Sequence, residues 1–363
     1  MSPSAPIARR SKTLSSQIGL TERIFSSAED RATAAAVEAG LNLVEAGLLS
    51  EVSFADSVAD VTTRYLLSAG GKRVRPMLTL LTAQLGNGNT PDVITAAQAV
   101  EITHLASLYH DDVMDEAERR RGVPSAQALW GNSVAILTGD LLFARASKLI
   151  ASLGQRAMLP QAEMFERLVL GQLHETVGPQ PDEDPIEHYL KVLSDKTGSL
   201  IAAAAQLGVM FSGAPREFEE PVMRFGERIG VAFQLIDDVI DLSPQAEETG
   251  KVPGTDLRSG VPTLPLLYLR RRAVGDPRAA ALLTRIESEV GAADGTHRVD
   301  GQVATADALA AIEELREHEV TAVTIAEAHR WSEDAVAALA PLPAGTVKKA
   351  LTRFAQVMVE RSS

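Results

Sequence analysis

The stretch HLASLYHDDVMDEAERRRG, residues 104–122, decides the fold and carries the first candidate site. Read as a helix, Asp111 and Asp115 are one turn apart on one face, and His104 lies close to the same stripe. Asp111, Asp112 and Asp115 repel one another, and Asp is a poor residue for a helix interior. A hard divalent cation resolves that conflict because it binds carboxylate oxygens. The alternative, from this stretch alone, is a charged and solvated helix face.

Arginines follow these acids directly, at Arg119, Arg120 and Arg121. Acids that gather a metal, beside arginines that gather an anion, indicate a phosphate ester bridged by Mg²⁺.

A second stretch, FQLIDDVID at residues 233–241, repeats the acid spacing with Asp237, Asp238 and Asp241. The residues before both motifs are apolar or small, so each acid cluster is expected at the end of a buried helix. Two such helices facing each other would form one metal-lined mouth above an apolar shaft. One DDxxD motif is weak evidence, but two that each end an apolar helix are hard to explain as surface.

The composition favours packed helices over sheets. Of 363 residues, 45% are hydrophobic and only 4% are aromatic, and Ala and Leu dominate. The net charge of −13 argues against nucleic acid as a partner. The absence of cysteine excludes disulfides and thiolate metal sites and fits the cytosol. The sequence has no apolar run of the ~20 residues that a membrane span needs, so no integral span is expected.

The N-terminal residues carry Arg9, Arg10 and Lys12 with several serines and no acid before residue 22. We expect residues 1–25 to be a disordered tail and residues 26–363 to be one domain; a transit peptide is the alternative for the tail.

A basic turn, GGKRVRP at residues 70–76, precedes the first motif. Pro76 fits the first position of a helix, which would place Lys72, Arg73 and Arg75 in a Gly-flanked turn at a helix N-terminus. Cationic side chains, backbone N–H groups and the positive end of the helix dipole favour an anion there. The alternative is a solvated basic turn.

Two further features concern helix packing and phosphate binding. Gly139 and Asp140 interrupt an apolar helix over residues 131–151, which marks either close helix packing with a polar contact or a tolerated irregularity. Lys196 and Thr197 precede a run of small, apolar residues and are candidates for holding a phosphate.

Taken together, the pattern predicts one all-α domain of ten or more helices, with no notable strands.

The combination of motifs resembles the trans-isoprenyl diphosphate synthases, or polyprenyl synthetases, strongly over about residues 60–270. The matching marks, in order, are GGKRVRP (70–76), HLASLYHDDVMD (104–115), RRG (120–122), GD (139–140), KTG (196–198), FQLIDDVID (233–241), GK (250–251) and TDL…TLP (255–265).

The resemblance implies the isoprenoid synthase fold, a bundle of helices around a central cavity, as a homodimer in the cytoplasm. It implies head-to-tail condensation of isopentenyl diphosphate with an allylic diphosphate, with three Mg²⁺ ions per active site. It further implies transient membrane contact for release of an apolar product.

The resemblance also assigns residues. Asp111, Asp115 and Asp237 would ligate Mg²⁺, with Asp112, Asp238 and Asp241 as further ligands or as supports. The catalytic group would be Asp111, Asp112, Asp115, Asp237, Asp238 and Lys196. The allylic side would be held by Arg120, Lys196, Thr197, Gln234 and Lys251. Isopentenyl diphosphate would be held by Lys72, Arg75, His104 and Arg121.

Product length is expected to depend on the residues before Asp111. Ala106 and Ser107 lie roughly 6–8 Å below that aspartate at a rise of about 1.5 Å per residue. In the resembling family a bulky aromatic side chain here stops growth early. Both residues are small, so we expect an open shaft, with the floor drawn from Val134, Ile136, Leu137 or Phe143. The predicted product is about C30 to C40; a plug from another helix, giving C15 or C20, is the alternative.

One position departs from the family pattern, because Val261 follows Gly260 where the family often has Lys. That removes one candidate phosphate contact, but all six aspartates remain. Two other functions compete: a terpene cyclase, which would lack the grip of Lys72, Arg75 and Arg121, and a non-catalytic subunit of a heteromeric synthase, which would be expected to lose acids.

Overall fold

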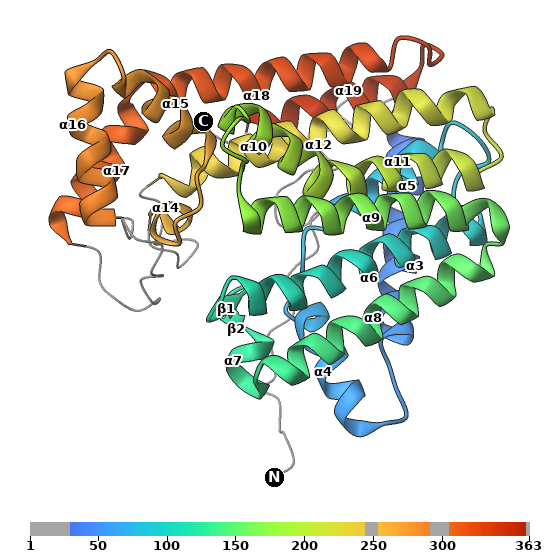
Figure 1. Cartoon of the computed structure of the whole chain (residues 1–363). Coiled ribbons are helices and arrows are strands. Elements are labelled where there is room, and N and C mark those ends of the chain that lie inside the picture. Colours follow the sequence, from blue (N-terminus) through green and yellow to red (C-terminus); the bar gives the residue numbers. More distant parts are fainter. Residues whose placement is uncertain (1–29, 244–252, 291–304, 361–363) are drawn as a thin grey trace. The chain divides into compact units, whose positions relative to one another are not determined.

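The computed structural model describes residues 30–243, 253–290 and 305–360, and they are almost entirely helical (Figure 1). The described part of the chain contains more than ten helices, as expected for the isoprenoid synthase fold. The predicted tail at residues 1–25 lies outside the described residues. Residues 26–363 as a single domain stay a prediction.

The helices pack as two compact units, each made of separate stretches of chain. Of the described residues, unit 1 comprises 30–167, 199–227 and 335–357, and unit 2 comprises 168–198, 228–243, 253–290, 305–334 and 358–360. Each unit carries one of the two acid motifs.

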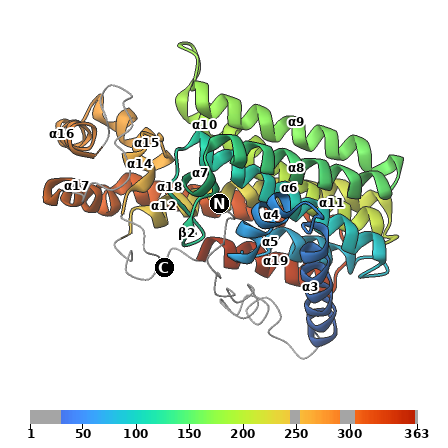
Figure 2. The ribbon, with the colours of Figure 1, turned by 90° about the horizontal axis from the view of Figure 1, so that it is seen from below.

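Unit 1 is built around α6 (Pro91–Met114), which lies beside α8 (Asn132–Ser152) in both views (Figures 1 and 2). The other elements that pack in this unit are α3 (Arg31–Glu51), α4 (Ser57–Ser68), α5 (Val74–Ala83), α7 (Ala126–Trp130) and α11 (Ser199–Phe211), with α19 (Thr346–Val359) contributing most of its length. Helices α9 (Gln155–Val177) and α12 (Glu219–Asp241) begin in unit 1.

Helix α6 begins where its sequence predicts. Thr90 is the N-cap, and its side chain accepts a hydrogen bond from the backbone N–H of Val93 at 3.2 Å. Pro91 follows in the first turn, where its missing N–H has no intrahelical partner to lose. Most of the helix is buried, and it reaches solvent mainly in its first turn, at Pro91 and Asp92, and in its last turn, with the acid motif.

Helix α8 runs without a break through Gly139 and Asp140, so these residues do not interrupt it. A Cβ on Gly139 would collide with the ring of His110 and would lie 3.2 Å from the carbonyl oxygen of Ala106. Gly139 therefore permits the close approach of α8 to α6. His110 Nε2 lies 3.0 Å from the carbonyl oxygen of Ile136 and 3.4 Å from Asp140 Oδ1, which confirms close packing with a polar contact.

A short antiparallel ribbon, β1 (Arg119–Arg120) and β2 (Val123–Pro124), follows α6. The sequence analysis expected no notable strands, and this ribbon is the small exception among the described residues. Its two-residue turn places Arg121 (φ 53°) and Gly122 (φ 77°) in the left-handed region, as two-residue hairpin turns require.

Helix α5 begins two residues earlier than expected. Arg73 precedes its first residue, Val74, so Pro76 is the third residue of the helix and not the first. Arg75 is therefore inside the first turn. Pro76 is tolerated there because backbone N–H groups in the first turn have no intrahelical acceptor.

Unit 2 contains the rest of α9 and α12 and the elements α10 (Pro185–Leu193), η2 (Ser194–Gly198), α14 (Thr255–Arg258), α15 (Leu264–Ala273), α16 (Pro277–Arg285), η4 (Ile286–Val290), α17 (Ala306–Glu317) and most of α18 (Glu319–Ala338). A buried apolar cluster that includes Leu269, Leu282, Ile312 and Leu315 joins α15, α16 and α17.

Helix α3 is the one helix in the described ranges whose length and apolar composition would allow it to cross a membrane, with a mean hydropathy of 1.2. Its residues Val37, Val44 and Leu48 are buried, and the helix packs against α5 and α6. It therefore contributes to the core of unit 1.

Candidate active site

The first acid motif occupies the C-terminal end of α6. Asp111 and Asp112 are in its last turn, and Asp115 is the C-cap, with its N–H bonded to the carbonyl oxygen of Asp111 at 2.8 Å. Asp115 is exposed, Asp111 is half-buried and Asp112 is fully buried. Carboxylates are unfavourable at this end of a helix because the dipole is negative there. A cation bound at this end would relieve both the dipole and the mutual repulsion.

Asp112 is tied to the ribbon by Arg120. Arg120 Nε donates a hydrogen bond to Asp112 Oδ1 at 2.6 Å, while Oδ2 of the same carboxylate is buried without a protein partner. Burial raises the pKa of Asp112, and the guanidinium of Arg120 opposes that shift. An unpartnered carboxylate oxygen is costly unless it binds another group, which makes it a fitting ligand or support for a metal.

A cluster of cations lies in unit 1 next to these acids. Arg75 is half-buried, its Nε is fully buried without a protein partner, and burial lowers the pKa of its guanidinium. The pKa of His104 is lowered well below its ordinary value by burial and then by Arg75, Arg121, Arg120 and Arg73. His104 is therefore neutral near pH 7 and can donate one hydrogen bond without adding charge.

Arg121 extends the cation cluster from the ribbon. Its guanidinium donates to the carbonyl oxygen of Leu66 at 2.9 Å and to that of Gly70. Burial lowers the pKa of Arg121 to about 10, and the charges of Arg73 and Arg120 add to that effect. Lys72, which stands between these residues in the basic turn, is exposed. The charges of Arg75, Arg120 and Arg121 all act on His104, so the structure brings these residues close together. The sequence analysis had assigned Arg120 to the allylic side and the other three residues to isopentenyl diphosphate.

Arg73 does not match the prediction for the basic turn. It is only 6% exposed and is ion-paired with Glu45 and Glu101. The sequence analysis placed Arg73 among the anion-binding residues. In the structure its guanidinium instead forms ion pairs with two glutamates.

The second acid motif occupies the last turns of α12, in unit 2. Asp238 is buried and accepts a hydrogen bond from the hydroxyl group of Tyr189. Burial raises the pKa of Asp238 well above its ordinary value; the hydrogen bonds from Tyr189 and Gln234 oppose this shift, and Asp256 and Asp237 add to it. Gln234 therefore supports Asp238, in addition to its predicted role in holding the allylic side.

Asp256 is a fourth acid beside this motif. Its backbone N–H donates to Asp241 Oδ2 at 3.0 Å, and the N–H of Gly254 donates to the carbonyl oxygen of Asp241 at 2.7 Å. The segment expected to be a loop therefore contains one helical turn, α14, that is fastened to the end of α12. Lys251, predicted to hold the allylic side, lies outside the described residues.

Lys196 lies in η2, a π-helical segment between α10 and α11. Its ammonium group is ion-paired with Glu175 on α9, and Thr197 is half-buried beside it. A Cβ on Gly171 would lie 2.5 Å from the backbone nitrogen of Lys196. Close packing on α9 thus fixes the π segment, a kind of distortion that is often found at functional sites.

The predicted chain-length wall lies on α6. Ala106 is fully buried, and Ser107 is half-buried with its hydroxyl group bonded to the carbonyl oxygen of His104 at 2.9 Å. Among the expected floor residues, Ile136 and Leu137 are 41% and 66% exposed on this chain, and their role as a floor stays a prediction. Val134 and Phe143, which are half-buried, stay candidates.

Metal binding fits these residues, although no group of three or more His, Asp or Glu side chains in the described ranges forms a ready-made cage. Mg²⁺ is usually bound by one or two carboxylates together with water and substrate phosphates, so a protein-only cage is not required. The unpartnered oxygen of Asp112 and the position of the acids at a helix C-terminus support such a site.

The sequence analysis missed several supporting residues. Glu45, Glu101, Glu175 and Tyr189 hold predicted site residues or their neighbours, and each is distant in sequence from the group that it contacts. Asp256 could have been identified from the sequence, because it lies in the TDL…TLP motif that matches the family, but the sequence analysis predicted no role for it.

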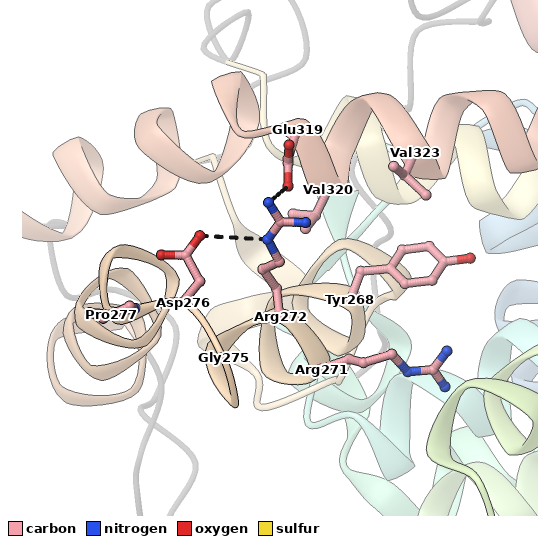
Figure 3. Close-up of a pocket in the computed structure, with 9 residues that line it drawn as sticks. All are labelled: Tyr268, Arg271, Arg272, Gly275, Asp276, Pro277, Glu319, Val320 and Val323. Atoms are coloured by element: carbon pink, nitrogen blue, oxygen red, sulfur yellow. Dashed lines mark ion pairs between the residues drawn. The ribbon is translucent and has the colours of Figure 1, made fainter.

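A different pocket of about 660 Å³ opens in unit 2 (Figure 3). Its cations are already paired: Arg272 contacts Glu319 at 2.7 Å and Asp276 at 3.5 Å, and Arg271 contacts Asp184 at 2.7 Å. None of the predicted site residues lines it.

The chain is similar to known proteins over most of its length. The sequence profile of the polyprenyl synthetase family matches residues 57–294. A nonaprenyl diphosphate synthase of Mycobacterium tuberculosis is 52% identical over 256 residues, which cover 70% of this chain and 76% of that protein. An octaprenyl diphosphate synthase of Escherichia coli is 32% identical, covering 88% and 94%. A geranylgeranyl pyrophosphate synthase structure from Corynebacterium glutamicum, complexed with calcium and isoprenyl diphosphate, matches with a TM-score of 0.77 and 41% identity, covering 93% and 99%.

Proposed function

The chain belongs to the polyprenyl synthetase family, and on that premise we propose that it condenses isopentenyl diphosphate head to tail with an allylic diphosphate. It is a prenyltransferase whose product is an all-trans, long-chain polyprenyl diphosphate, with diphosphate as the second product.

The observation that carries this proposal is the cation cluster of unit 1. Arg75 keeps a buried Nε without a protein partner, and Arg121 has a guanidinium whose pKa is lowered to about 10 by burial and nearby cations. Buried cations that repel one another are stabilised by a polyanion, and a diphosphate group offers several acceptor oxygens at once. Lys72, Arg75, His104 and Arg121 are assigned to isopentenyl diphosphate.

The allylic diphosphate is assigned to the acid motifs and to Arg120, Lys196, Thr197, Gln234 and Lys251. Asp111, Asp112, Asp115, Asp237, Asp238 and Asp241 would hold Mg²⁺, directly or as supports. Bound Mg²⁺ supplies positive charge that stabilises the departing diphosphate. The calcium in the similar structure from C. glutamicum supports a divalent metal; Mg²⁺, and three ions per site, are the proposal.

The chemical steps follow from these assignments. The carbon–oxygen bond of the allylic diphosphate breaks, and Arg120 and Lys196 stabilise the charge that grows on the leaving oxygens. The double bond of isopentenyl diphosphate then attacks the allylic cation. The attack leaves a tertiary cation on isopentenyl diphosphate. The carbon between this cation and the carbon that bears the diphosphate group then loses a proton to the released diphosphate, which forms the new double bond. Apolar surroundings are needed because water would trap the cation.

Product length is proposed as C30 to C40, on the grounds that Ala106 and Ser107 are small. The 41% identity to a geranylgeranyl pyrophosphate synthase favours a shorter product as the second candidate. Chromatography of the extended products separates the two.

A homodimer is proposed because large apolar side chains are exposed on α8 and α9. Within unit 1, Ile136, Leu137, Met158 and Leu159 are 41%, 66%, 54% and 65% exposed. Large apolar side chains that are exposed on a single chain are candidates for burial in a protein–protein interface. Light scattering of the purified chain tests the state, and Leu137→Asp is expected to shift it towards monomer. A monomeric wild-type chain would refute the proposal.

A cytoplasmic location with transient membrane contact is also proposed. The chain has no cysteine, which fits a reducing compartment, and a long prenyl product is too apolar to leave into water. Sedimentation with lipid vesicles before and after turnover tests the contact; product retained on the protein in the presence of vesicles would contradict it.

The experiment that tests the function uses the purified chain alone with Mg²⁺, an allylic diphosphate and radiolabelled isopentenyl diphosphate. Incorporation of label into a long prenyl product is expected. No incorporation with any allylic primer would overturn the proposal and would favour a non-catalytic subunit.

Lys72→Ala and Arg75→Ala are expected to raise mainly the KM for isopentenyl diphosphate, because each removes a charge-assisted contact. A change confined to the allylic KM would mean that the two sites are exchanged.

A further inference from the structure

Arg73 has the most completely satisfied guanidinium in the basic turn. Its Nε donates to Glu45 Oε2 at 2.8 Å and its second terminal nitrogen donates to Glu45 Oε1 at 3.1 Å, which is a bidentate contact. Its other terminal nitrogen donates to Glu101 Oε1 at 3.1 Å and to the carbonyl oxygen of Gly70 at 3.4 Å. These contacts use nearly all its donors, so little capacity is left for a substrate.

The backbone of Arg73 is also unusual. Its φ of 50° is in the left-handed region, which is unfavourable for a residue with a side chain. The strained residue leads directly into α5, where Arg75 lies two positions later. The contacts to Glu45 on α3 and to Glu101 on α6 hold this conformation, and therefore hold the start of α5, in place.

Arg73 and Arg121 meet at the glycine turn. A Cβ on Gly71 would lie 2.5 Å from a terminal nitrogen of Arg73 and 2.9 Å from one of Arg121. Both arginines donate to the carbonyl oxygen of Gly70. The position of Arg121 therefore depends on the turn that Arg73 holds.

Glu101 explains why this arrangement needs a cation at position 73. Glu101 is only 3% exposed, and its charge acts on both Arg75 and Arg121. If Arg73 were absent, Glu101 would be a buried charge without its ion-pair partner, and it would attract the two arginines assigned to the substrate.

We propose that Arg73 is a positioning residue for the isopentenyl diphosphate site: by pairing with Glu45 and Glu101 and fixing the glycine turn, it keeps Arg75 and Arg121 available for the diphosphate of the substrate. The inference rests on the proposed function for the identity of that substrate. Its physical content, an anion site maintained by an arginine that does not touch the anion, holds for any diphosphate.

The test compares four variants with the wild-type chain. Arg73→Met removes the charge, and Arg73→Lys keeps the charge but not the bidentate geometry. Arg73→Met with Glu101→Gln removes both partners of the buried pair. Arg64→Met is the matched control, because the side chain of Arg64 is 45% exposed and is ion-paired with Asp60 on the same helix.

The expected result is a split between the two substrates. Arg73→Met should raise the KM for isopentenyl diphosphate about tenfold or more, with the allylic KM within twofold. Arg73→Lys should raise it about threefold. The double variant Arg73→Met with Glu101→Gln should reverse at least half of the increase in log KM for isopentenyl diphosphate, because the unpaired buried charge of Glu101 is gone. Arg64→Met should leave both KM values unchanged.

Two results would overturn the inference: equal changes in both KM values, or no change in a folded variant. If Arg73→Met does not fold, Arg73→Lys decides by the same criterion. Binding of inorganic diphosphate without metal, measured by calorimetry, separates this inference from the proposed function. If the wild-type chain makes no prenyl product but binds diphosphate more tightly than Arg73→Lys does, the function fails and the positioning role stands. If both bind diphosphate equally, the positioning role fails.

Discussion

Tyr189 donates its hydroxyl hydrogen to Oδ2 of Asp238, and both residues are buried in unit 2. The contact joins α10 to the middle acid of the second motif. Burial raises the pKa of Asp238 well above its ordinary range, and this hydrogen bond opposes the shift. Tyr189 therefore favours the anionic form of a carboxylate that burial disfavours.

Replacing this tyrosine should weaken the allylic side of the reaction. Tyr189→Phe removes one hydroxyl group from a buried pair, and loss of such a supporting contact typically costs about 10- to 100-fold in metal affinity or activity. We expect that decrease in kcat/KM for the allylic diphosphate, with a higher Mg²⁺ requirement. Tyr268→Phe, which changes a half-buried tyrosine on α15, is the control. An unchanged Mg²⁺ titration for Tyr189→Phe would show that the contact has no part in metal binding.

Activity should depend on a divalent metal and on both acid motifs. EDTA should abolish turnover, and Mg²⁺ should restore it. Asp111→Ala and Asp237→Ala should each lower kcat by orders of magnitude, because developing charge on the leaving diphosphate is then poorly neutralised. Circular dichroism should show that both variants keep their helices. Glu38→Ala, an exposed acid on α3, should be fully active. Full activity of either aspartate variant contradicts the assignment.

Stability should fall as the pH is lowered below about 6.5, in part because of His104. Its pKa in the folded chain is well below the ordinary value, so the unfolded chain binds a proton that the folded chain does not. Unfolding is therefore favoured as the pH falls, by up to about 1.4 kcal/mol per pH unit for one group. Thermal melts at pH 7 and pH 5 should show a smaller decrease in Tm for His104→Gln than for the wild-type chain. His329→Gln, at an exposed position, should behave as wild type; equal decreases for His104→Gln and wild type would refute the prediction.

Product length should respond to position 106. Ala106→Tyr places a ring where α6 now has a fully buried methyl group, and we expect shorter prenyl products in chromatography. Overpacking costs about 1–3 kcal/mol, so Tm is measured in parallel. Ser107→Ala changes little volume and should keep the native product. If Ala106→Tyr is folded and active with the native product length, residue 106 does not form the wall.

Local features of the sequence predicted much of this molecule. Acid spacing placed both motifs at the ends of buried helices, and Thr90 with Pro91 marked the start of α6 correctly. The close packing at Gly139 was one of two readings of its sequence, and the contact with His110 decides between them.

Features that depend on distant parts of the chain were not predictable in this way. Arg73 has the same local sequence whether it binds an anion or a glutamate, and its partners are each 28 residues away. Tyr189 and Asp238 are 49 residues apart, and no local pattern links them. Only the packing of helices brings these pairs together, so local sequence patterns could not predict the contacts that hold Arg73 and Asp238.

Lys196 lies in the π-helical segment at residues 194–198, so its position depends on the number of residues in this segment as well as on its side-chain contacts. A π segment arises when a helix carries one residue more than its regular turns can take. Deleting one residue here would restore a regular α-helix and would turn Lys196 by roughly 100° about the helix axis relative to α10. Its ammonium group would then leave Glu175, although its neighbours in the sequence would be almost the same. The place of this lysine therefore depends on the number of residues in the segment between α10 and α11.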